Sequence, residues 1–472
     1  MDALPDIVGT AERLRRGEVT SAQLTEEAIA RTDRIDPEVG SFVSRFDDQA
    51  RDAAARADAE LRAGHIRGPL HGIPVGVKDI ITTTEGPTTA QSLVHDAAWN
   101  PEDAVVVSRL REAGAVIVGK LTTMEFAIGA PDEEKPFPIP RNPWDLSRWA
   151  GGSSSGSGSA VSTGMVFAAL GTDTAGSIRI PAAYCGITGL MPTFGRVPKS
   201  GCVPLGFTLD HIGPMARSAA DCAAVLDVIA GHHPSDLTSI DTDHTPVVGG
   251  LSGDLRGKRV GVASLVDEAG DAADPMTQRL FADAVTLLED AGATAVPVQL
   301  PLYAEMRAAN MVIMLSEALA YHLGDLRAHW SDYFTETRAL VAAGLAFTGA
   351  DYVQAQRVRQ VAQQQMAELY TDVDLVVTPT CATGASPLTR AVDVVEGDDF
   401  ATIHTQYWDC IGNPAMSLPM GFSADGLPLG LQVAGRPFDE AGVLAAGVAV
   451  QERSDWHRAV PPVADIAVTD AA

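Results

Sequence analysis

Nine consecutive residues, from Gly151 to Ser159, are all glycine or serine and read GGSSSGSGS. Composition alone favours a flexible linker for such a run. A linker joins two finished units, however, and this run lies between the segment NPW at 142–144 and an apolar segment at 165–170 that is typical of a protein core. Glycine also lets the backbone approach a substrate closely. We therefore interpret the run as a hydroxyl-rich loop inside one folded unit.

The loop lacks the patterns of phosphate and dinucleotide sites. It does not end in Gly-Lys-Ser/Thr, and it contains no Gly-x-Gly-x-x-Gly between a strand and a helix. The eleven histidines show no His-Glu-x-x-His spacing, and the five cysteines form no Cys-x-x-Cys pair. We expect neither a metal nor a cofactor. A hydroxyl nucleophile in this loop then needs a base from elsewhere in the chain.

Charge and cysteine content restrict the partners and the compartment. The net charge of −27 disfavours direct binding to nucleic acid or to anionic membranes. Five scattered cysteines are typical of reduced thiols in a cytoplasmic protein, and none lies beside a convincing histidine base. The start of the chain does not resemble a signal peptide, and no apolar run approaches the roughly 18–20 residues that span a bilayer. We expect a cytoplasmic protein without a membrane or nucleic-acid partner.

Hydrophobic patterns alternate between strands and helices along the chain. The first 65 residues favour helices. The spacing then predicts further elements: a helix over 103–113, a strand over 115–118, a helix over 218–230, a strand–helix–strand unit over 259–300, mostly helices over 303–370, late strands at 375–378, 415–419 and 429–433, and a closing helix over 440–451. This alternation predicts an α/β fold, namely one large domain with a mixed, substantially parallel central sheet covered by helices on both faces.

Three separated segments carry a resemblance to a known family. They are HGIPVGVKD at 71–79, GGSSSGSGSAV at 151–161 and GTDTAGSIRIPAAYCGITGLMPT at 171–193. Together with NPW at 142–144 and GLPLGLQVAGRPF at 426–438, they resemble the amidase signature family in order and spacing. The similarity covers most of the chain and thins over residues 230–370. It implies the fold of that family and hydrolysis of C–N bonds.

The resemblance implies a catalytic triad of Lys78, Ser153 and Ser177. Ser177 would be the nucleophile, Ser153 the bridging serine after a cis peptide bond, and Lys78 the base. An exposed lysine has a pKa near 10.4 and would be charged at neutral pH. Burial disfavours the charged form and lowers that pKa. We therefore predict a buried, neutral Lys78 that takes a proton from Ser153 while Ser153 takes one from Ser177.

Further residues of the site follow from the same motifs. The oxyanion is expected to bind the backbone N–H groups of Ser177 and of three residues before it, which are Thr174, Ala175 and Gly176. Supporting roles are expected for Ser154, Asp173 and Arg179, with the last two as a charge pair bracing the loop. Candidate substrate-binding residues are Ala127, Ile128, Trp149 and Tyr407. His71, His211 and His404 suggest a Ser-His-Asp alternative, but isolated histidines are mostly structural.

The resemblance also predicts one domain over residues 1–472. Its parts are N-terminal helices at 1–65, a catalytic core at 68–230 with the lysine and serine motifs, and a helical insertion at 303–370 near the substrate channel. The predicted function is an amidase that hydrolyses a small carboxamide or anilide through a Ser177 acyl-enzyme. Its partner would be that small molecule, and the protein would be a monomer or homodimer.

Two other functions stay open within the family. One is a carbamate or ester hydrolase, which uses the same acyl-transfer steps. The other is the amidase subunit of glutamyl-tRNA(Gln) amidotransferase. Against it, a Gly-x-Arg-Tyr-Gly-like motif typical of that subunit is replaced here by EALAYHLGDLRAHWSDY, and Thr402 aligns with an acidic residue that binds the amino group of glutamine. A non-catalytic member is disfavoured because Lys78, Ser153 and Ser177 are all present.

Overall fold

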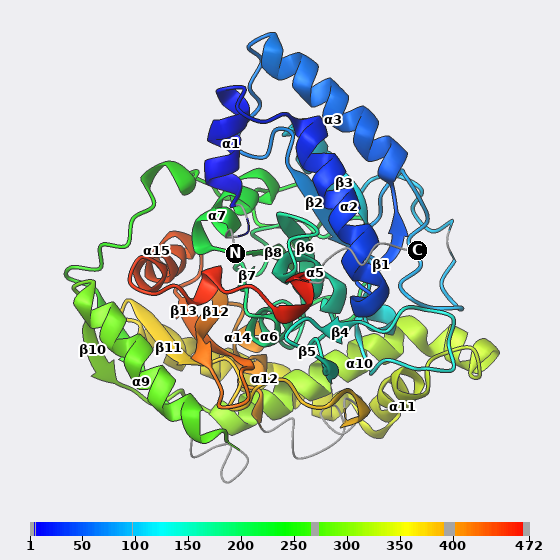
Figure 1. The fold of residues 1–472 in the computed structure, drawn as a ribbon. Helices are drawn as coiled ribbons and strands as arrows, with labels where there is room; N and C mark the ends of the chain where they lie inside the picture. Colours follow the sequence, from blue (N-terminus) through cyan, green and yellow to red (C-terminus); the bar gives the residue numbers. More distant parts are fainter. Residues whose placement is uncertain (1–3, 5, 97, 266–272, 391–401, 466–472) are drawn as a thin grey trace.

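A single mixed sheet organises the molecule (Figure 1). The computed structural model describes residues 4, 6–96, 98–265, 273–390 and 402–465. Its main sheet has 11 strands in the order β1-β3-β2-β6-β8-β7-β12-β13-β11-β9-β10. These strands are β1 (Phe42–Arg45), β2 (Pro74–Lys78), β3 (Val116–Leu121), β6 (Ala168–Asp173), β7 (Thr188–Met191), β8 (His211–Ala216), β9 (Arg259–Val262), β10 (Thr294–Pro297), β11 (Leu375–Pro379), β12 (Ala415–Phe422) and β13 (Pro428–Gly435). A small hairpin consists of β4 (Arg141–Asn142) and β5 (Asp145–Trp149).

Parallel and antiparallel pairs occupy different parts of the sheet. Parallel pairs join β3 to β2 and β2 to β6 on one side, and β11 to β9 and β9 to β10 on the other. Antiparallel pairs connect β6, β8, β7, β12, β13 and β11 between these blocks, and also join β1 to β3. The predicted mixed α/β sheet is confirmed. Because β2 and β6 run in the same direction, their carboxyl ends lie at one edge of the sheet.

Helices cover both faces of the sheet, as predicted. They are α1 (Ile7–Arg15), α2 (Ser21–Val39), α3 (Asp47–Arg62), α4 (Val105–Glu112), α5 (Ser155–Ser162), α6 (Arg179–Cys185), α7 (Ala219–Ile229), α9 (Pro275–Asp290), α10 (Tyr303–His329), α11 (Thr335–Ala343), α12 (Gly349–Leu369), α14 (Gln406–Ile411) and α15 (Glu440–Gln451). Side chains alternate along a strand. Val116 and Val118 of β3 belong to a core with α2, α3 and α5, whereas Ile117 between them belongs to a core with α4, α7 and α15.

Several helices begin where the sequence offers a cap. The Thr20 side chain accepts the N–H of Gln23, and the Gln23 side chain accepts the N–H of Thr20, which is a capping box at the start of α2. At the start of α7, the Ser218 side chain accepts the N–H of Asp221 and so caps the helix. α15 has the predicted bounds, and the helix predicted over 103–113 is α4. Short 3-10 turns are η1 (Glu125–Ala127), η2 (Val248–Gly250), η4 (Gly344–Ala346), η5 (Leu388–Arg390), η7 (Trp456–Arg458) and η8 (Pro462–Asp465).

The Gly/Ser run is part of the core. Its second half forms the start of α5, and every residue of that helix is buried. A Cβ atom on Gly156 would lie 2.3 Å from the carbonyl oxygen of Ser41 and 2.5 Å from the backbone nitrogen of Thr122. Only glycine therefore lets the helix lie this close to the neighbouring strand ends. The linker interpretation of the run is excluded.

The region predicted to be helical, 303–370, forms a group of long helices. α10 packs against α11, α12 and α14, and these helices lie together at the lower part of Figure 1. Met311, Met314 and Leu315 on α10 reach the cavity beside Ser177, as does Leu340 on α11. Within the described part of the chain, no helix has the length and apolar character needed to cross a bilayer.

Candidate active site

Lys78 lies at the end of β2 and is completely buried. Its Nζ atom is 2.7 Å from Ser153 Oγ, 3.0 Å from Ser154 Oγ and 2.7 Å from Thr172 Oγ1. Thr172 is on β6, the parallel neighbour of β2, so its place follows from the strand pairing. We did not predict Thr172 from the sequence, because its proximity to Lys78 depends on which strands are neighbours.

The environment of Lys78 favours the neutral amine. Burial lowers the pKa of Lys78 from 10.5 to about 7, and the carboxylates of Asp173 and Asp210 oppose this decrease only in part. The three nearest polar partners are hydroxyl groups. Among the described residues, no carboxylate forms an ion pair with Lys78. A large share of this lysine can therefore act as a base at neutral pH.

Two loops bring the serines together at the edge of the sheet. The bond between Gly152 and Ser153 is cis, as the resemblance implies. The backbone N–H of Ser154 donates to the carbonyl oxygen of Ser177 at 3.2 Å, which ties the start of α5 to the turn between β6 and α6. Ser153 and Ser177 both line one cavity. Ser153 thus contacts Lys78 on one side and opens to the same space as Ser177 on the other.

The turn after β6 supplies backbone donors beside Ser177. The N–H of Gly176 donates to Asp173 Oδ1 at 2.5 Å, so this predicted oxyanion donor is already engaged. No acceptor within the described ranges is bonded to the N–H groups of Thr174, Ala175 or Ser177, and all three residues line the cavity. These three N–H groups are therefore the free candidates for binding an oxyanion.

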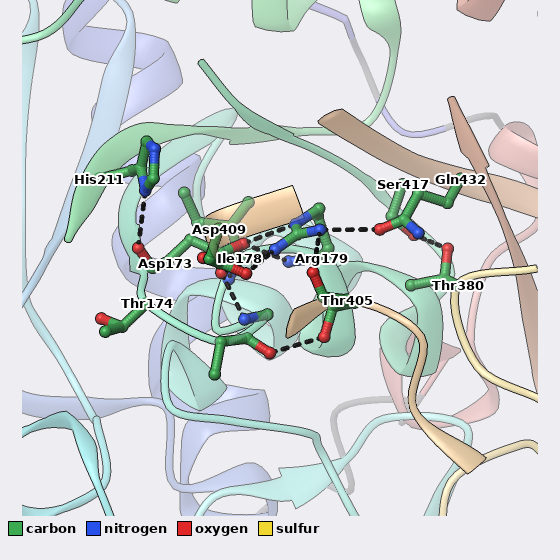
Figure 2. Close-up of polar contacts among 12 residues, drawn as sticks. Asp173, Thr174, Ile178, Arg179, His211, Thr380, Thr405, Asp409, Ser417 and Gln432 are labelled. Carbon is green, nitrogen blue, oxygen red and sulfur yellow. Dashed lines mark hydrogen bonds and ion pairs between the residues drawn. The ribbon is translucent and has the colours of Figure 1, made fainter. Parts of the chain in front are cut away.

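A buried charge network braces the turn (Figure 2). Arg179 Nε donates to Asp173 Oδ2 at 2.9 Å, and Arg179 Nη2 donates to Asp409 Oδ2 at 2.5 Å. The guanidinium holds the pKa of Asp173 low, at about 2, although burial acts in the opposite direction. Burial and the charge of Asp173 raise the pKa of Asp409 well above its usual range. The low pKa of Asp173 keeps that carboxylate ionised at neutral pH, whereas burial and the neighbouring charge disfavour the carboxylate form of Asp409.

Two partners of Arg179 come from the end of the chain and were not predicted. Its Nη1 atom donates to the carbonyl oxygen of Thr405 at 2.9 Å and to Gln432 Oε1 at 2.8 Å. Gln432 lies on β13, inside the GLPLGLQVAGRPF motif. That motif was a sequence signal for a buried role, but the partner of Gln432 was not evident without the fold.

The histidines do not form a Ser-His-Asp arrangement. His211 Nδ1 is 3.2 Å from the carbonyl oxygen of Asp173, and burial lowers the pKa of His211 to about 3. His404 Nδ1 is 2.7 Å from the hydroxyl of Tyr303, and His71 Nε2 is 3.1 Å from a carboxylate oxygen of Glu60. Each of these rings therefore has a partner outside the serine loops.

The cavity beside Ser177 is largely apolar. It is lined by Met124, Ala127, Ile128, Gly129, Trp149, Gly152, Ser153, Thr174, Ala175, Ser177, Ile180, Leu205, Met311, Met314, Leu315, Leu340 and Ile403. Three of the four predicted substrate-binding residues, Ala127, Ile128 and Trp149, are among them. Tyr407 is not: it is fully buried, and its hydroxyl donates to the carbonyl oxygen of Pro301 at 3.0 Å. The structure thus places Tyr407 in the core between α14 and α10.

The segment that carries Ala127 and Ile128 is hydrogen-bonded, through Glu125, to the start of α11. Glu125 is fully buried and accepts the hydroxyl of Ser92 at 2.6 Å and the backbone N–H of Phe334 at 2.7 Å. Phe334 directly precedes α11. Burial raises the pKa of Glu125 to about 7. No group of three metal-ligating side chains occurs among the described residues.

Comparisons with family models, protein sequences and solved structures all identify amidases or related proteins as similar to this chain. The family model described as Amidase matches residues 23–444. A glutamyl-tRNA(Gln) amidotransferase subunit from Chloroflexus aggregans is 39% identical, over 96% of this chain and 96% of that protein. The native peptide amidase of Stenotrophomonas maltophilia has 31% identity and a TM-score of 0.83, over 97% of this chain and 98% of that one. A chain from a vestigial protein complex, studied for the origins of an s-triazine catabolic enzyme, has 31% identity and a TM-score of 0.87, over 95% and 99%.

Proposed function

Because this chain belongs to the amidase family, also known as the amidase signature family, we propose that it hydrolyses the C–N bond of a small carboxamide or anilide with an apolar acyl group. As a family member it is a hydrolase of amide bonds. The substrate class and the roles of the individual residues are our proposal.

In the proposed reaction, Ser177 attacks the carbonyl carbon. Its proton passes to Ser153, whose proton passes to the neutral amine of Lys78. The negative charge that develops on the carbonyl oxygen binds free backbone N–H groups of the turn. When the tetrahedral intermediate collapses, Ser153 gives the leaving amine a proton and regains one from Lys78. Water then attacks the Ser177 ester by the same relay and releases the acid.

One observation carries the choice of substrate, namely the apolar lining of the cavity at Ser177. No described lining residue is charged, and three of them are methionines. Burying an ammonium or carboxylate group without a partner is strongly unfavourable. A free amino acid such as glutamine, which carries both groups, would leave them unpaired against this lining. An apolar acyl group fits it without such a cost.

The second candidate is the amidase subunit of glutamyl-tRNA(Gln) amidotransferase. A specific observation favours it, because the amidotransferase relative from Chloroflexus aggregans shares 39% identity over nearly the whole chain. On similarity alone this candidate has better support than a simple amidase. The uncharged cavity and the threonine at position 402, in place of the acidic residue, support the simple amidase. A carbamate or ester hydrolase shares the proposed chemistry and is an outcome of the same test.

The test is a hydrolysis panel with S177A as the blank. The panel contains aliphatic amides, anilides, carbamates, esters and glutamine. We expect turnover of amides or anilides with apolar acyl groups and none of glutamine. Preferred glutamine hydrolysis, together with a second protein that copurifies from the native host, would establish the amidotransferase instead. Equal turnover by S177A would exclude Ser177 as the nucleophile.

A further inference from the structure

Thr405 holds the turn that carries the nucleophile without reaching the cavity. Its hydroxyl donates to the carbonyl oxygen of Ala175 at 2.6 Å (Figure 2). Thr405 is fully buried, directly precedes α14, and is not among the described residues that line the cavity. Because Thr405 bonds the turn on the side away from the cavity, it can affect the reaction only by changing the conformation of the turn.

The peptide group between Ala175 and Gly176 is held at both ends. Thr405 binds its oxygen, and Asp173 Oδ1 accepts its N–H at 2.5 Å. Gly176 has a φ of 128°, and a Cβ atom there would lie 2.0 Å from Thr405 Oγ1. The threonine hydroxyl thus occupies the space that any side chain at position 176 would need.

Thr405 is itself fixed by the buried charge network. Its carbonyl oxygen accepts from Arg179 Nη1 at 2.9 Å, and Arg179 Nη2 donates to Asp409 one turn further along α14. Arg179 begins α6, which follows the nucleophile turn. Thr405, which holds the turn, is therefore itself fixed by Arg179 of α6, and Arg179 is in turn bonded to Asp409 of α14.

We propose that Thr405 is a positioning residue that sets the orientation of the oxyanion-binding N–H groups on either side of the Ala175–Gly176 peptide. The inference deepens the proposed function and rests on it. The N–H groups of Ala175 and Ser177 flank the held peptide, and both residues line the cavity. A displacement of this peptide would move the Cα atoms of Ala175 and Gly176, to which the two flanking peptide groups are attached, and would shift both donors relative to the reacting oxygen. Catalytic rates are sensitive to displacements of about 1 Å, with losses near 10²-fold.

The test compares three variants at position 405 with a matched control. T405V and T405A remove the hydroxyl, and T405S keeps it. T32V is the control, since Thr32 is also a buried threonine whose hydroxyl donates to a main-chain carbonyl, that of Ala28 at 2.8 Å, in α2. The readouts are kcat and KM for the best substrate of the panel, the rate of Ser177 labelling by a fluorophosphonate, and Tm.

We expect T405V and T405A to lower kcat and the labelling rate by about 10- to 100-fold with KM nearly unchanged, and T405S to recover most of that loss. T32V should keep the wild-type rates. The inference is overturned if T405A labels as fast as T32V, or if T405S is as slow as T405A, because the hydroxyl would then not be the active feature. A wild-type enzyme that is not labelled at Ser177 would instead overturn the proposed function, and the inference with it.

Discussion

A neutral lysine amine has two N–H donors and one lone pair, and three hydroxyl groups surround Nζ of Lys78. Ser154 Oγ donates its own hydrogen to the carbonyl oxygen of Thr172 at 3.2 Å, so Ser154 can only accept from Lys78. If Thr172 accepts the other N–H, the lone pair faces Ser153. In the proposed reaction, this arrangement would give Ser153, and not its neighbours, the path for proton transfer.

The first prediction concerns the protonation of Lys78. Because its pKa is lowered to about 7, kcat/KM should rise with pH and reach half of its maximum near pH 7. K78R keeps a side chain that is charged at every accessible pH, so it should be inactive throughout. K78A should lose at least about 10³-fold near pH 7 and recover in part at higher pH. Profiles of kcat/KM against pH for the three enzymes test this.

The same shift has a consequence for stability. Between pH 7 and 10.5, the unfolded chain binds a proton at Lys78 that the folded protein does not, so the free energy of unfolding should rise with pH across this window. K78M lacks the group. The free energy of unfolding of wild type should therefore increase relative to that of K78M as the pH rises. A constant difference from urea titrations would show that Lys78 is not perturbed.

At the scale of elements, Arg179 of α6 bonds two unlike carboxyl groups, Asp173 at the end of β6 and Asp409 of α14. D173N should lower the free energy of unfolding by about 3–5 kcal/mol, because it leaves the buried Arg179 without its charged partner. D409N removes a carboxyl group whose charged form is already disfavoured by burial, so it should cost less than D173N, about 1 kcal/mol. Denaturant unfolding of the two variants measures both. Equal losses would mean that Asp409 is ionised.

Another prediction at this scale concerns Glu125 of η1, whose carboxylate is bonded to the residue before α11. Between pH 4.5 and 7, folded Glu125 keeps a proton that the unfolded chain has lost, so the free energy of unfolding should fall as the pH rises through this window. E125Q removes this titration. The difference between wild type and E125Q should shift in favour of E125Q as the pH rises from 4.5 to 7. Parallel curves for the two proteins would contradict the assignment.

The elements show what sequence reasoning can reach. Helix ends with local caps, such as Thr20 and Ser218, were predictable because their partners are three residues away. Lys78, Ser153 and Ser177 could be proposed because each lies in a recognisable motif. Thr405 could not, because its role depends on a contact with Ala175 across 230 residues of sequence. Tyr407 was assigned to the substrate channel because members of the resembled family place this late loop near the active site, and only the packing of α14 on α10 revealed its place in the core.

On the scale of the whole molecule, acidic residues outnumber basic ones, and the net charge is −27. Repulsion among these charges opposes the compact state. Raising NaCl from about 0.01 to 0.2 M shortens the screening length from about 30 to below 10 Å and should raise Tm by about 2–4 °C. Thermal melts with NaCl and KCl should give the same increase. An effect of one salt only would indicate specific ion binding instead of screening.

The whole-molecule architecture was predictable only in outline. Alternating strands and helices indicated a mixed α/β sheet, but not that its parallel pairs form two blocks separated by antiparallel strands. Strand order is set by packing between distant segments, and periodicity within a segment carries no information about it.

β2 and β6 are interior neighbours in this sheet, with Val77 opposite Leu170. β2 is also paired with β3 and β6 with β8, so removing either strand from the sheet would break two ladders, and Lys78 and Thr172 cannot separate by local fraying. The site that we propose for catalysis should then persist until the sheet as a whole unfolds. On heating, activity should be lost at the temperature at which the sheet itself unfolds, and not at a lower one.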